Sequence, residues 1–271
     1  MRMKGVGYVV FAVTFVALGA LSLFSGDFAY VWQPVPPDIP GRAFIAYVSG
    51  AFMCTVGIGL LNRRTVAPAS LMLAAYTLLW LLLLHVPHLL VAPLQEVNWG
   101  ACAEIALLVA AAWIVYGLMA TPDGALYVAP LTSTKAMRLA RWLFALALPL
   151  IGLEHLIYAQ PTADLVPAWL PDRLGWAAVT GVAHIAAGVA IFFFLLPRLA
   201  AVLEAWMMGI FTLFVWVPVV IATPTQRFAW TALLMSTVMT AAAWIVADSF
   251  RGVPWFSFSR SRNQLADVVV H

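Results

Sequence analysis

The chain has 271 residues, of which 64% are hydrophobic and only 9% are charged, with a formal net charge of +3 and a mean hydropathy of +0.98. Soluble domains carry about 25% charged residues, so this composition excludes a water-soluble fold, and the small net charge does not indicate nucleic-acid binding. Continuous apolar runs of about 20 residues cross a bilayer as helices, which excludes a barrel of alternating strands. The sequence therefore predicts an all-α polytopic membrane protein.

Eight spans follow one another along the chain, separated by polar or Pro/Gly-rich turns. The first apolar run lacks a small-x-small cleavage site and is expected to be retained rather than removed as a signal peptide. The expected spans are residues 5–25, 43–61, 67–90, 100–119, 140–158, 174–196, 199–221 and 228–248.

Basic residues gather on one side of these spans. If the amino terminus is inside, the inner positions hold eleven basic residues and the outer ones three, which predicts that both termini lie in the cytoplasm. The inner residues are Arg2, Lys4, Arg63, Arg64, Lys135, Arg138, Arg141, Arg198, Arg251, Arg260 and Arg262, and the outer ones are Arg42, Arg173 and Arg227.

An internal repeat appears when the chain is shifted by 131 residues. The matched pairs are Val35-Pro36 with Val166-Pro167, Pro40 with Pro171, Arg42 with Arg173, Gly50 with Gly181, Gly57 with Gly188, Val86-Pro87 with Val217-Pro218, Trp99 with Trp230, and residues 110–115 with 241–246. Because each unit has four spans, both units insert with the same orientation, as parallel repeats. The expected organisation is a first four-helix repeat in 1–120, a cytoplasmic linker in 121–139, a second four-helix repeat in 140–250 and a cytoplasmic tail in 251–271.

The repeat suggests two four-helix bundles packed side by side, with several residues in structural roles. Gly50 and Gly181 are expected to let neighbouring helices approach closely. Pro87 and Pro218 are expected to kink or end the third helix of each unit near its outer end. Arg42 and Arg173 are expected to pair with Asp38 and Asp172 or to anchor the outer loops. Cys54 and Cys102 fall on different spans, so a disulfide between them is not expected.

Ionisable side chains within spans are costly, so each one is a candidate functional group. They are His85, His88, Glu104, Glu154, His155, His184 and Glu204. At about 1.5 Å per residue, five of them fall in the outer third of the membrane, with His184 near the midplane and Glu204 near the inner face. The candidate ligand-binding residues are Glu154, His155, His184, His85, His88 and Glu104.

The Glu154-His155 pair stands in the second unit only, because Leu23 and Phe24 occupy its place in the first at the same shift. The two side chains lie about 100° apart on a helix, so at least one must face inward or sideways, although both could instead reach the interface. His184 is too deep to reach water and is expected to line a site. Glu204 follows Arg198 closely and is expected to lie at the membrane interface.

His85 and His88, spaced i and i+3, share a helix face that could hold a metal or a haem, or could simply end the helix beside Pro87. Glu104 could equally be a hydrogen-bonded structural group. The sequence has no C-x-x-C, no phosphate-binding Gly-rich loop and no Gly-x-Ser-x-Gly elbow, so no catalytic motif identifies an enzyme.

The Glu154-His155 segment, followed by residues 166–171 (Val-Pro-Ala-Trp-Leu-Pro), resembles the DoxX-like family of bacterial membrane proteins. The first unit carries a similar pattern in Pro36 to Gly57 and in residues 84–87 (Leu-His-Val-Pro). The family is typically a four-helix unit, so the resemblance implies a doubled member. The resemblance also implies a role in redox chemistry at the membrane, since members of the family include a subunit of a thiosulfate:quinone oxidoreductase. The family supplies no fixed catalytic residues to carry over.

Three functional hypotheses follow from these features. The first is a subunit or accessory of a quinone-linked membrane redox system, with quinone bound at the outer His/Glu site, a redox partner protein, and a homo-oligomer as a further expectation. The second is a non-enzymatic protein that binds or transports a small molecule or lipid between the two units. The third is haem or metal ligation by His85, His88, His155 and His184.

Overall fold

The computed structural model describes residues 5–258, and that part of the chain is all-helical, with 77% helix and no strand. Eight of its helical runs are long and apolar enough to cross a membrane. They are α1 (Val6–Ser25), α2 (Arg42–Leu61), the run of α3 (Val66–Trp80), η2 (Leu81–His85) and α4 (Val86–Val91), α5 (Glu96–Met119), α7 (Thr134–Ile157), α9 (Arg173–Phe192), the run of α10 (Pro197–Phe211), η3 (Thr212–Trp216) and α11 (Val217–Ala222), and α12 (Arg227–Asp248). The connections contain η1 (Tyr30–Trp32), α6 (Ala129–Thr132) and α8 (Ala159–Leu165).

Three span boundaries differ from those expected. Helix α5 begins four residues early, with Glu96 in its first turn, where a carboxylate suits the positive end of the helix dipole. Helix α7 begins inside the expected linker, because the Ser133 hydroxyl accepts a hydrogen bond from the Ala136 N–H and caps the helix. Helix α9 ends at Phe192, since Phe194 and Leu196 adopt left-handed conformations that break the helix.

Both prolines expected to disturb a span do so through a π turn. The π turns η2 and η3 directly precede Val86-Pro87 and Val217-Pro218. Proline has no N–H to donate, and its ring collides with the carbonyl four residues earlier, so a wider turn relieves the strain. The two helical runs thus depart from regular α-helix next to Pro87 and Pro218 and continue beyond them, to Val91 and Ala222.

The elements of the two halves recur at a constant spacing. Helices α2 and α9, α3 and α10, the π turns η2 and η3, and α4 and α11 each begin and end 131 residues apart. This agreement in helix and π-turn boundaries supports the predicted tandem repeat.

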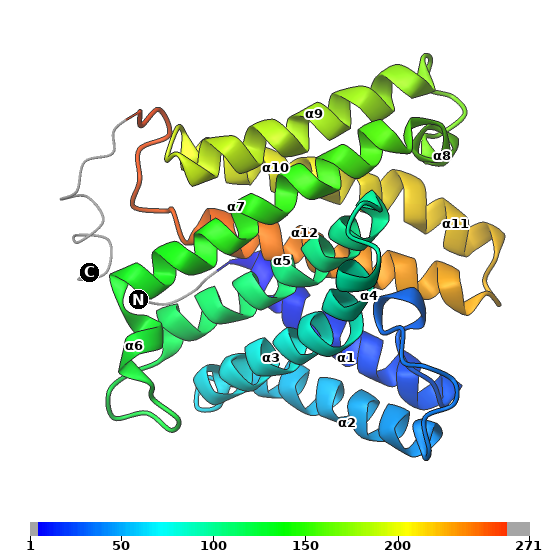
Figure 1. Cartoon of the computed structure of the whole chain (residues 1–271). Helices are drawn as coiled ribbons and strands as arrows, with labels where there is room; N and C mark the ends of the chain where they lie inside the picture. Colours follow the sequence, from blue (N-terminus) through cyan, green and yellow to red (C-terminus); the bar gives the residue numbers. More distant parts are fainter. Residues whose placement is uncertain (1–4, 259–271) are drawn as a thin grey trace.

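The packing differs from two separate bundles side by side. Helix α1 packs on α2 and on α12, and helix α7 packs on α9 and on α5 (Figure 1). Within the described residues, α1 has few or no contacts with α5, and α7 has few or no contacts with α12. The first span of each half is therefore packed against the last span of the other half, which makes the eight spans one body.

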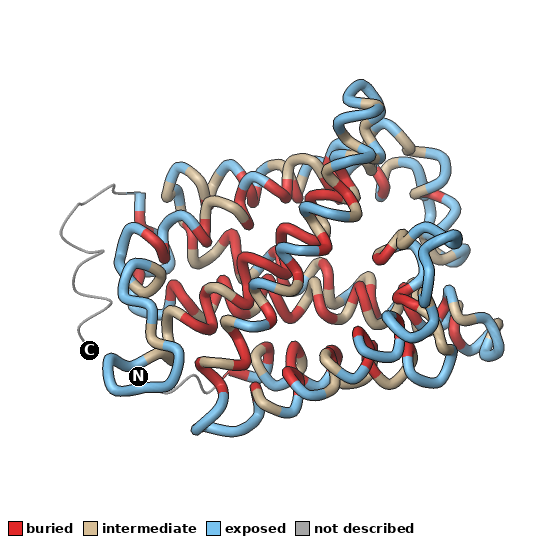
Figure 2. Tube along the Cα trace, turned by 60° about the horizontal axis from the view of Figure 1, so that its bottom comes forward, coloured by how far each residue is buried: buried red, intermediate tan, exposed pale blue. Residues whose placement is uncertain are grey.

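The core lies along α5 and α12, which also contact each other. These two helices have the most buried spans, and their facing surfaces are rich in alanine, as in Ala110 to Ala112 and Ala241 to Ala243, all fully buried. Figure 2 shows the buried residues running through the middle of the molecule, with exposed residues on its outer helices and loops. Small side chains let these two helices approach closely in lipid.

Glycine pairs set the contact between the first two spans of each half. A Cβ built on Gly19 would lie 2.5 Å from the Gly50 carbonyl oxygen, and one built on Gly152 would lie 2.4 Å from that of Gly181. The predicted role of Gly50 and Gly181 as close-contact residues is confirmed.

These contacts change which residues of the first half correspond to Glu154 and His155. A Cβ on Gly50 would lie 3.1 Å from the Ser22 Cβ, and a Cβ on Gly181 would lie 3.1 Å from the His155 Cβ. The first helices are thus related by 133 residues rather than 131, because the first outer loop is two residues longer. Leu21 and Ser22, and not Leu23 and Phe24, occupy the places of Glu154 and His155.

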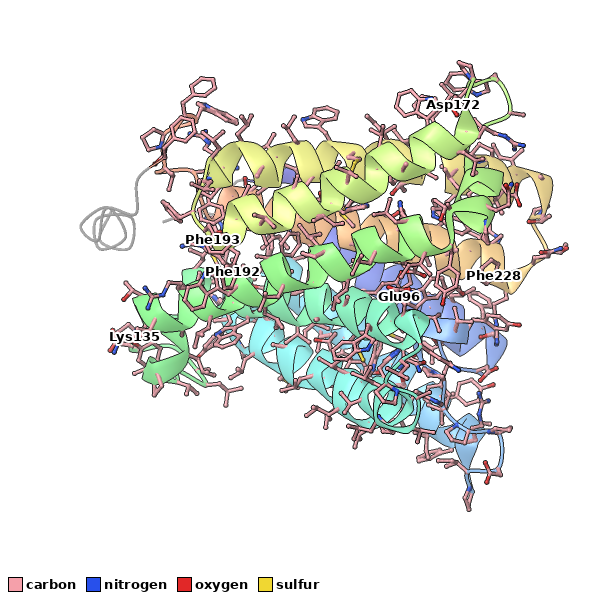
Figure 3. All side chains as sticks on the ribbon, turned by 45° about the horizontal axis from the view of Figure 1, so that its top comes forward. Glu96, Lys135, Asp172, Phe192, Phe193 and Phe228 are labelled. Carbon is pink, nitrogen blue, oxygen red and sulfur yellow. The ribbon has the colours of Figure 1, made fainter. Side chains whose placement is uncertain are left out.

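The two ends of the helical body differ in charge. Lys135 lies at one end, near the linker that contains α6, whereas Glu96, Asp172 and Phe228 lie toward the opposite end (Figure 3). We call these the linker end and the far end. Arg63 and Arg64, in the α2–α3 turn, are exposed at the linker end. Arg2, Lys4, Arg260 and Arg262, counted in the charge pattern, lie outside the described residues.

Candidate functional site

Three helices of the second half bring His155, His184 and Glu204 together. His155 lies near the end of α7, His184 in the middle of α9, and Glu204 two turns into α10. The contact of Gly152 with Gly181 holds the α7 and α9 backbones together one turn away from the two histidines. The imidazole rings lie 5.1 Å apart between centroids, at an interplanar angle of 87°.

The Thr180 hydroxyl fixes the tautomer of His155. Thr180 Oγ1 donates its single proton to the Ala177 carbonyl at 3.0 Å, as hydroxyls often do within a helix. With the Thr180 proton on the Ala177 carbonyl, the imidazole is the donor in the 3.0 Å contact between His155 Nδ1 and Thr180 Oγ1. In this arrangement neutral His155 carries its proton on Nδ1, and the lone pair of Nε2 has no hydrogen bond to any described residue. Since His155 is only partly buried, that lone pair is available to a ligand.

His184 and Glu204 form a pair inside the protein. His184 Nδ1 lies 2.6 Å from Glu204 Oε1, and the two side chains are only 2% and 1% exposed. The second carboxylate oxygen, Oε2, is buried and has no hydrogen-bond partner among the described residues. An unpaired buried carboxylate oxygen is costly, so this position is chemically unusual.

An aromatic side chain covers the two imidazoles. Phe211 lies at the end of α10, with its ring 6.2 Å from that of His155 and 6.4 Å from that of His184. Farther along the same run, Phe214 is 50% exposed and contacts Trp169, which belongs to the loop between α8 and α9. Phe214, three residues farther along the chain than Phe211, and Trp169 thus form an exposed aromatic contact.

Glu154 does not join this site, although it is adjacent to His155 in the sequence. Its carboxylate turns toward α5, where a Cβ on Gly100 would lie 2.7 Å from Glu154 Oε2 and 3.6 Å from Glu96 Oε1. Both carboxylate oxygens of Glu96 are buried without a partner. The expected site is thus divided by α7, with the histidines on one side and a group of carboxylates on the other.

Glu104 belongs to the α5 side as well. Its Oε2 accepts a hydrogen bond from Trp32 Nε1 at 2.6 Å. His85 contacts the same residue, with Nε2 3.1 Å from the Trp32 carbonyl oxygen. Glu104 and His85 thus hold η1 in place, which agrees with the structural alternative considered for Glu104.

His85 and His88 differ in exposure. His85 is 4% exposed at the end of the π turn, whereas His88 is exposed on α4. The described residues contain no group of three or more His, Cys, Asp or Glu side chains that could hold a metal ion.

A second polar group, which the sequence analysis missed, occupies the corresponding place in the first half. Ser49, the counterpart of Thr180, is hydrogen-bonded to the Tyr76 hydroxyl, and both accept from the Gln33 side-chain amide. His184 and Glu204 have the apolar counterparts Met53 and Leu73, both fully buried. Hydroxyls are thus placed alike in the two halves, but the ionisable pair is present in only one.

Arg42 pairs with Asp27, not with the expected Asp38. Asp27 also binds Arg227 of the second half, at 2.9 Å, with the Arg42 contact at 2.5 Å. The loop after α1 reaches over α12, which brings the two arginines together. Asp172 caps α9 through the Gly175 N–H, and no ion pair joins it to Arg173.

We expect Asp27→Asn to lower the free energy of unfolding by about 1.5 kcal/mol, because two charged hydrogen bonds are weakened. Burial opposes ionisation of Asp27, but hydrogen bonds from the Phe28 N–H, Arg227 and Arg42 outweigh it and hold its pKa below the usual value. The stabilisation is therefore present above the unfolded pKa of about 3.9 and is lost as the pH falls through the lower folded pKa.

Denaturant titrations from neutral pH to below pH 4 measure this effect. Wild type should lose more stability than Asp27→Asn over the acid range. Asp38→Asn, an exposed residue of the same loop, is the control. Parallel pH profiles for wild type and Asp27→Asn would contradict the assignment.

Comparison with known proteins adds no relative: no family model, curated protein or solved structure matches this chain.

Proposed function

We propose that this chain is an integral membrane protein that binds a quinol, or a similar lipid-soluble hydroxylic ring compound, beside His155. In this proposal it is a doubled DoxX-like protein of the bacterial inner membrane, with the linker end in the cytoplasm. It serves a quinone-linked redox system as a subunit or accessory of a partner protein. The resemblance of the Glu154-His155 segment and the following loop supports the family, and the excess of basic residues at the linker end supports the orientation.

The observation that carries the proposal is the free lone pair on His155 Nε2. A ring hydroxyl is a hydrogen-bond donor, and the Thr180 contact leaves this nitrogen as an acceptor. A position near the far end of α7 gives a ligand access from the lipid, where quinones dissolve. Phe211 offers a face for the ring of the ligand, at a distance typical of aromatic pairs.

We expect His155→Ala to weaken binding of a short-chain benzohydroquinone by about tenfold or more, as expected for loss of one good hydrogen bond to a ligand. The full chain in lipid nanodiscs is titrated anaerobically with the hydroquinone, and binding is followed by tryptophan fluorescence. His88→Ala is the matched control, because His88 is an exposed membrane histidine on α4. Equal affinities in wild type and His155→Ala would exclude this site, and no binding to wild type would exclude the function.

A further inference from the structure

The unpartnered oxygen of Glu204 points to a role beyond packing. The side chain is only 1% exposed, and its partner His184 is equally enclosed. If Glu204 is ionised and His184 neutral, a net negative charge lies in the protein interior with one oxygen, Oε2, lacking any donor. One added proton, shared by the carboxylate and the imidazole, makes the pair neutral overall. The resting pair is therefore best described as holding one extra proton.

His155 is the neighbour to which that proton can pass. Its ring contacts that of His184, and the Nε2 atoms of both imidazoles make no hydrogen bond to described residues. With 5.1 Å between the ring centroids, a proton would pass from one imidazole to the other through a bridging water molecule. Proton transfer to His155 Nε2 changes this nitrogen from a hydrogen-bond acceptor into a donor, while Nδ1 continues to donate to Thr180.

Other charged groups on the surrounding helices are turned away from the three side chains. Each is bonded elsewhere or exposed at a helix end: Glu154 faces Gly100, Arg141 donates to Ser249, Asp164 accepts from Gln160, Arg198 donates to the Val253 carbonyl, Arg227 pairs with Asp27, Asp248 pairs with Arg251, and Lys135, Arg138 and Arg173 are exposed. The position of the extra proton is thus set chiefly by His155, His184 and Glu204.

Resting on the proposed function, we propose that the His184–Glu204 pair stores the proton that lets His155 bind both forms of a quinone ligand. The hydroxyl of the reduced form donates to neutral His155, with the proton kept on the pair. The carbonyl of the oxidised form accepts from protonated His155, after the proton has moved from the pair to His155 Nε2. The ligand is neither oxidised nor reduced in this exchange: one N–H or O–H bond breaks on the pair and one N–H bond forms on His155.

The first half of the chain supplies the substitutions for a test. His184→Met with Glu204→Leu installs the residues that stand 131 positions earlier, Met53 and Leu73, in a similar packing environment. The full chain in nanodiscs is titrated separately with a short-chain benzoquinone and with its hydroquinone, and thermal unfolding of the variant checks its folding.

Wild type is expected to bind both forms. The double variant should lose benzoquinone affinity by about tenfold and hydroquinone affinity to a smaller extent, because the donor state of His155 has lost its proton source whereas its acceptor state has not.

Equal loss of both forms, or of neither, in a folded double variant would overturn the proton store while leaving hydroquinone binding by wild type as a separate result. Absence of binding of both forms to wild type would overturn the proposed function together with this inference. Infrared difference spectra between two pH values give a readout without ligand. Either the carboxylic-acid C=O band or the imidazolium ring bands of wild type should be weaker in Glu204→Leu, according to which partner holds the proton, and no change in either would contradict protonation of the pair.

Discussion

Replacing His184 by Met should lower the free energy of unfolding by about 3–5 kcal/mol, because Glu204 then keeps a buried carboxyl group without its partner. Replacing Glu204 by Leu leaves the His184 Nδ1 position unpaired and should cost about 1–3 kcal/mol. With both replacements together, stability should return to within about 1 kcal/mol of wild type or exceed it, since a buried ion pair is often no more stable than apolar residues of similar volume.

The cycle of two single variants and one double variant separates pairing from packing. Unfolding in mixed detergent micelles, followed by circular dichroism, gives the four free energies. A positive coupling of about 2 kcal/mol or more is expected, because the two side chains share a hydrogen bond of 2.6 Å in the interior. If the double variant loses as much as the two single variants added together, the pair does not interact as described.

The fold follows from the sequence where the signal is strong. Long apolar runs fix the eight spans, because lipid solvates only helices or closed barrels. The predicted span boundaries were wrong where local interactions determine the helix end. The Ser133 cap extends α7 into the expected linker, and the left-handed conformation of Phe194 ends α9 earlier than expected. The predicted packing partners of the helices were less accurate than the boundaries. The sequence did not predict the packing of α1 on α12, because the eight spans have similar apolar faces and apolar composition does not distinguish one pairing from another.

The candidate site was only partly predictable for the same reason. The sequence placed His155 near the end of its helix and His184 near the middle of its own, as in the structure, but the direction of a side chain around its helix depends on packing. Glu154 therefore faces α5, although it precedes His155 directly. Glu204 was assigned to the interface because of Arg198, yet α10 begins at Pro197 and carries Glu204 two turns inward. The signal that could have found it is the repeat itself, which places Met53 and Leu73 opposite His184 and Glu204.

Gly152→Ala should destabilise the protein by about 1–3 kcal/mol, because the new Cβ would lie 2.4 Å from the Gly181 carbonyl oxygen and the α7 and α9 backbones would have to separate. Gly209→Ala is the contrasting substitution. Its Cβ would lie 3.4 Å from Thr240 Cγ2, an ordinary contact, and the helix would gain up to about 1 kcal/mol from the better helix former. Thermal unfolding of both variants in the same detergent measures the difference.

Gly19→Ala distinguishes a general loss of stability from damage to the site. Its Cβ would lie 2.5 Å from the Gly50 carbonyl oxygen, the same obstruction between α1 and α2 of the first half. Both variants should unfold at lower temperature. Only Gly152→Ala should also weaken hydroquinone binding, because separating α7 from α9 moves His155 away from Thr180 and leaves its Nε2 without a fixed orientation. Equal weakening in both variants would mean that the ligand depends on overall packing rather than on His155.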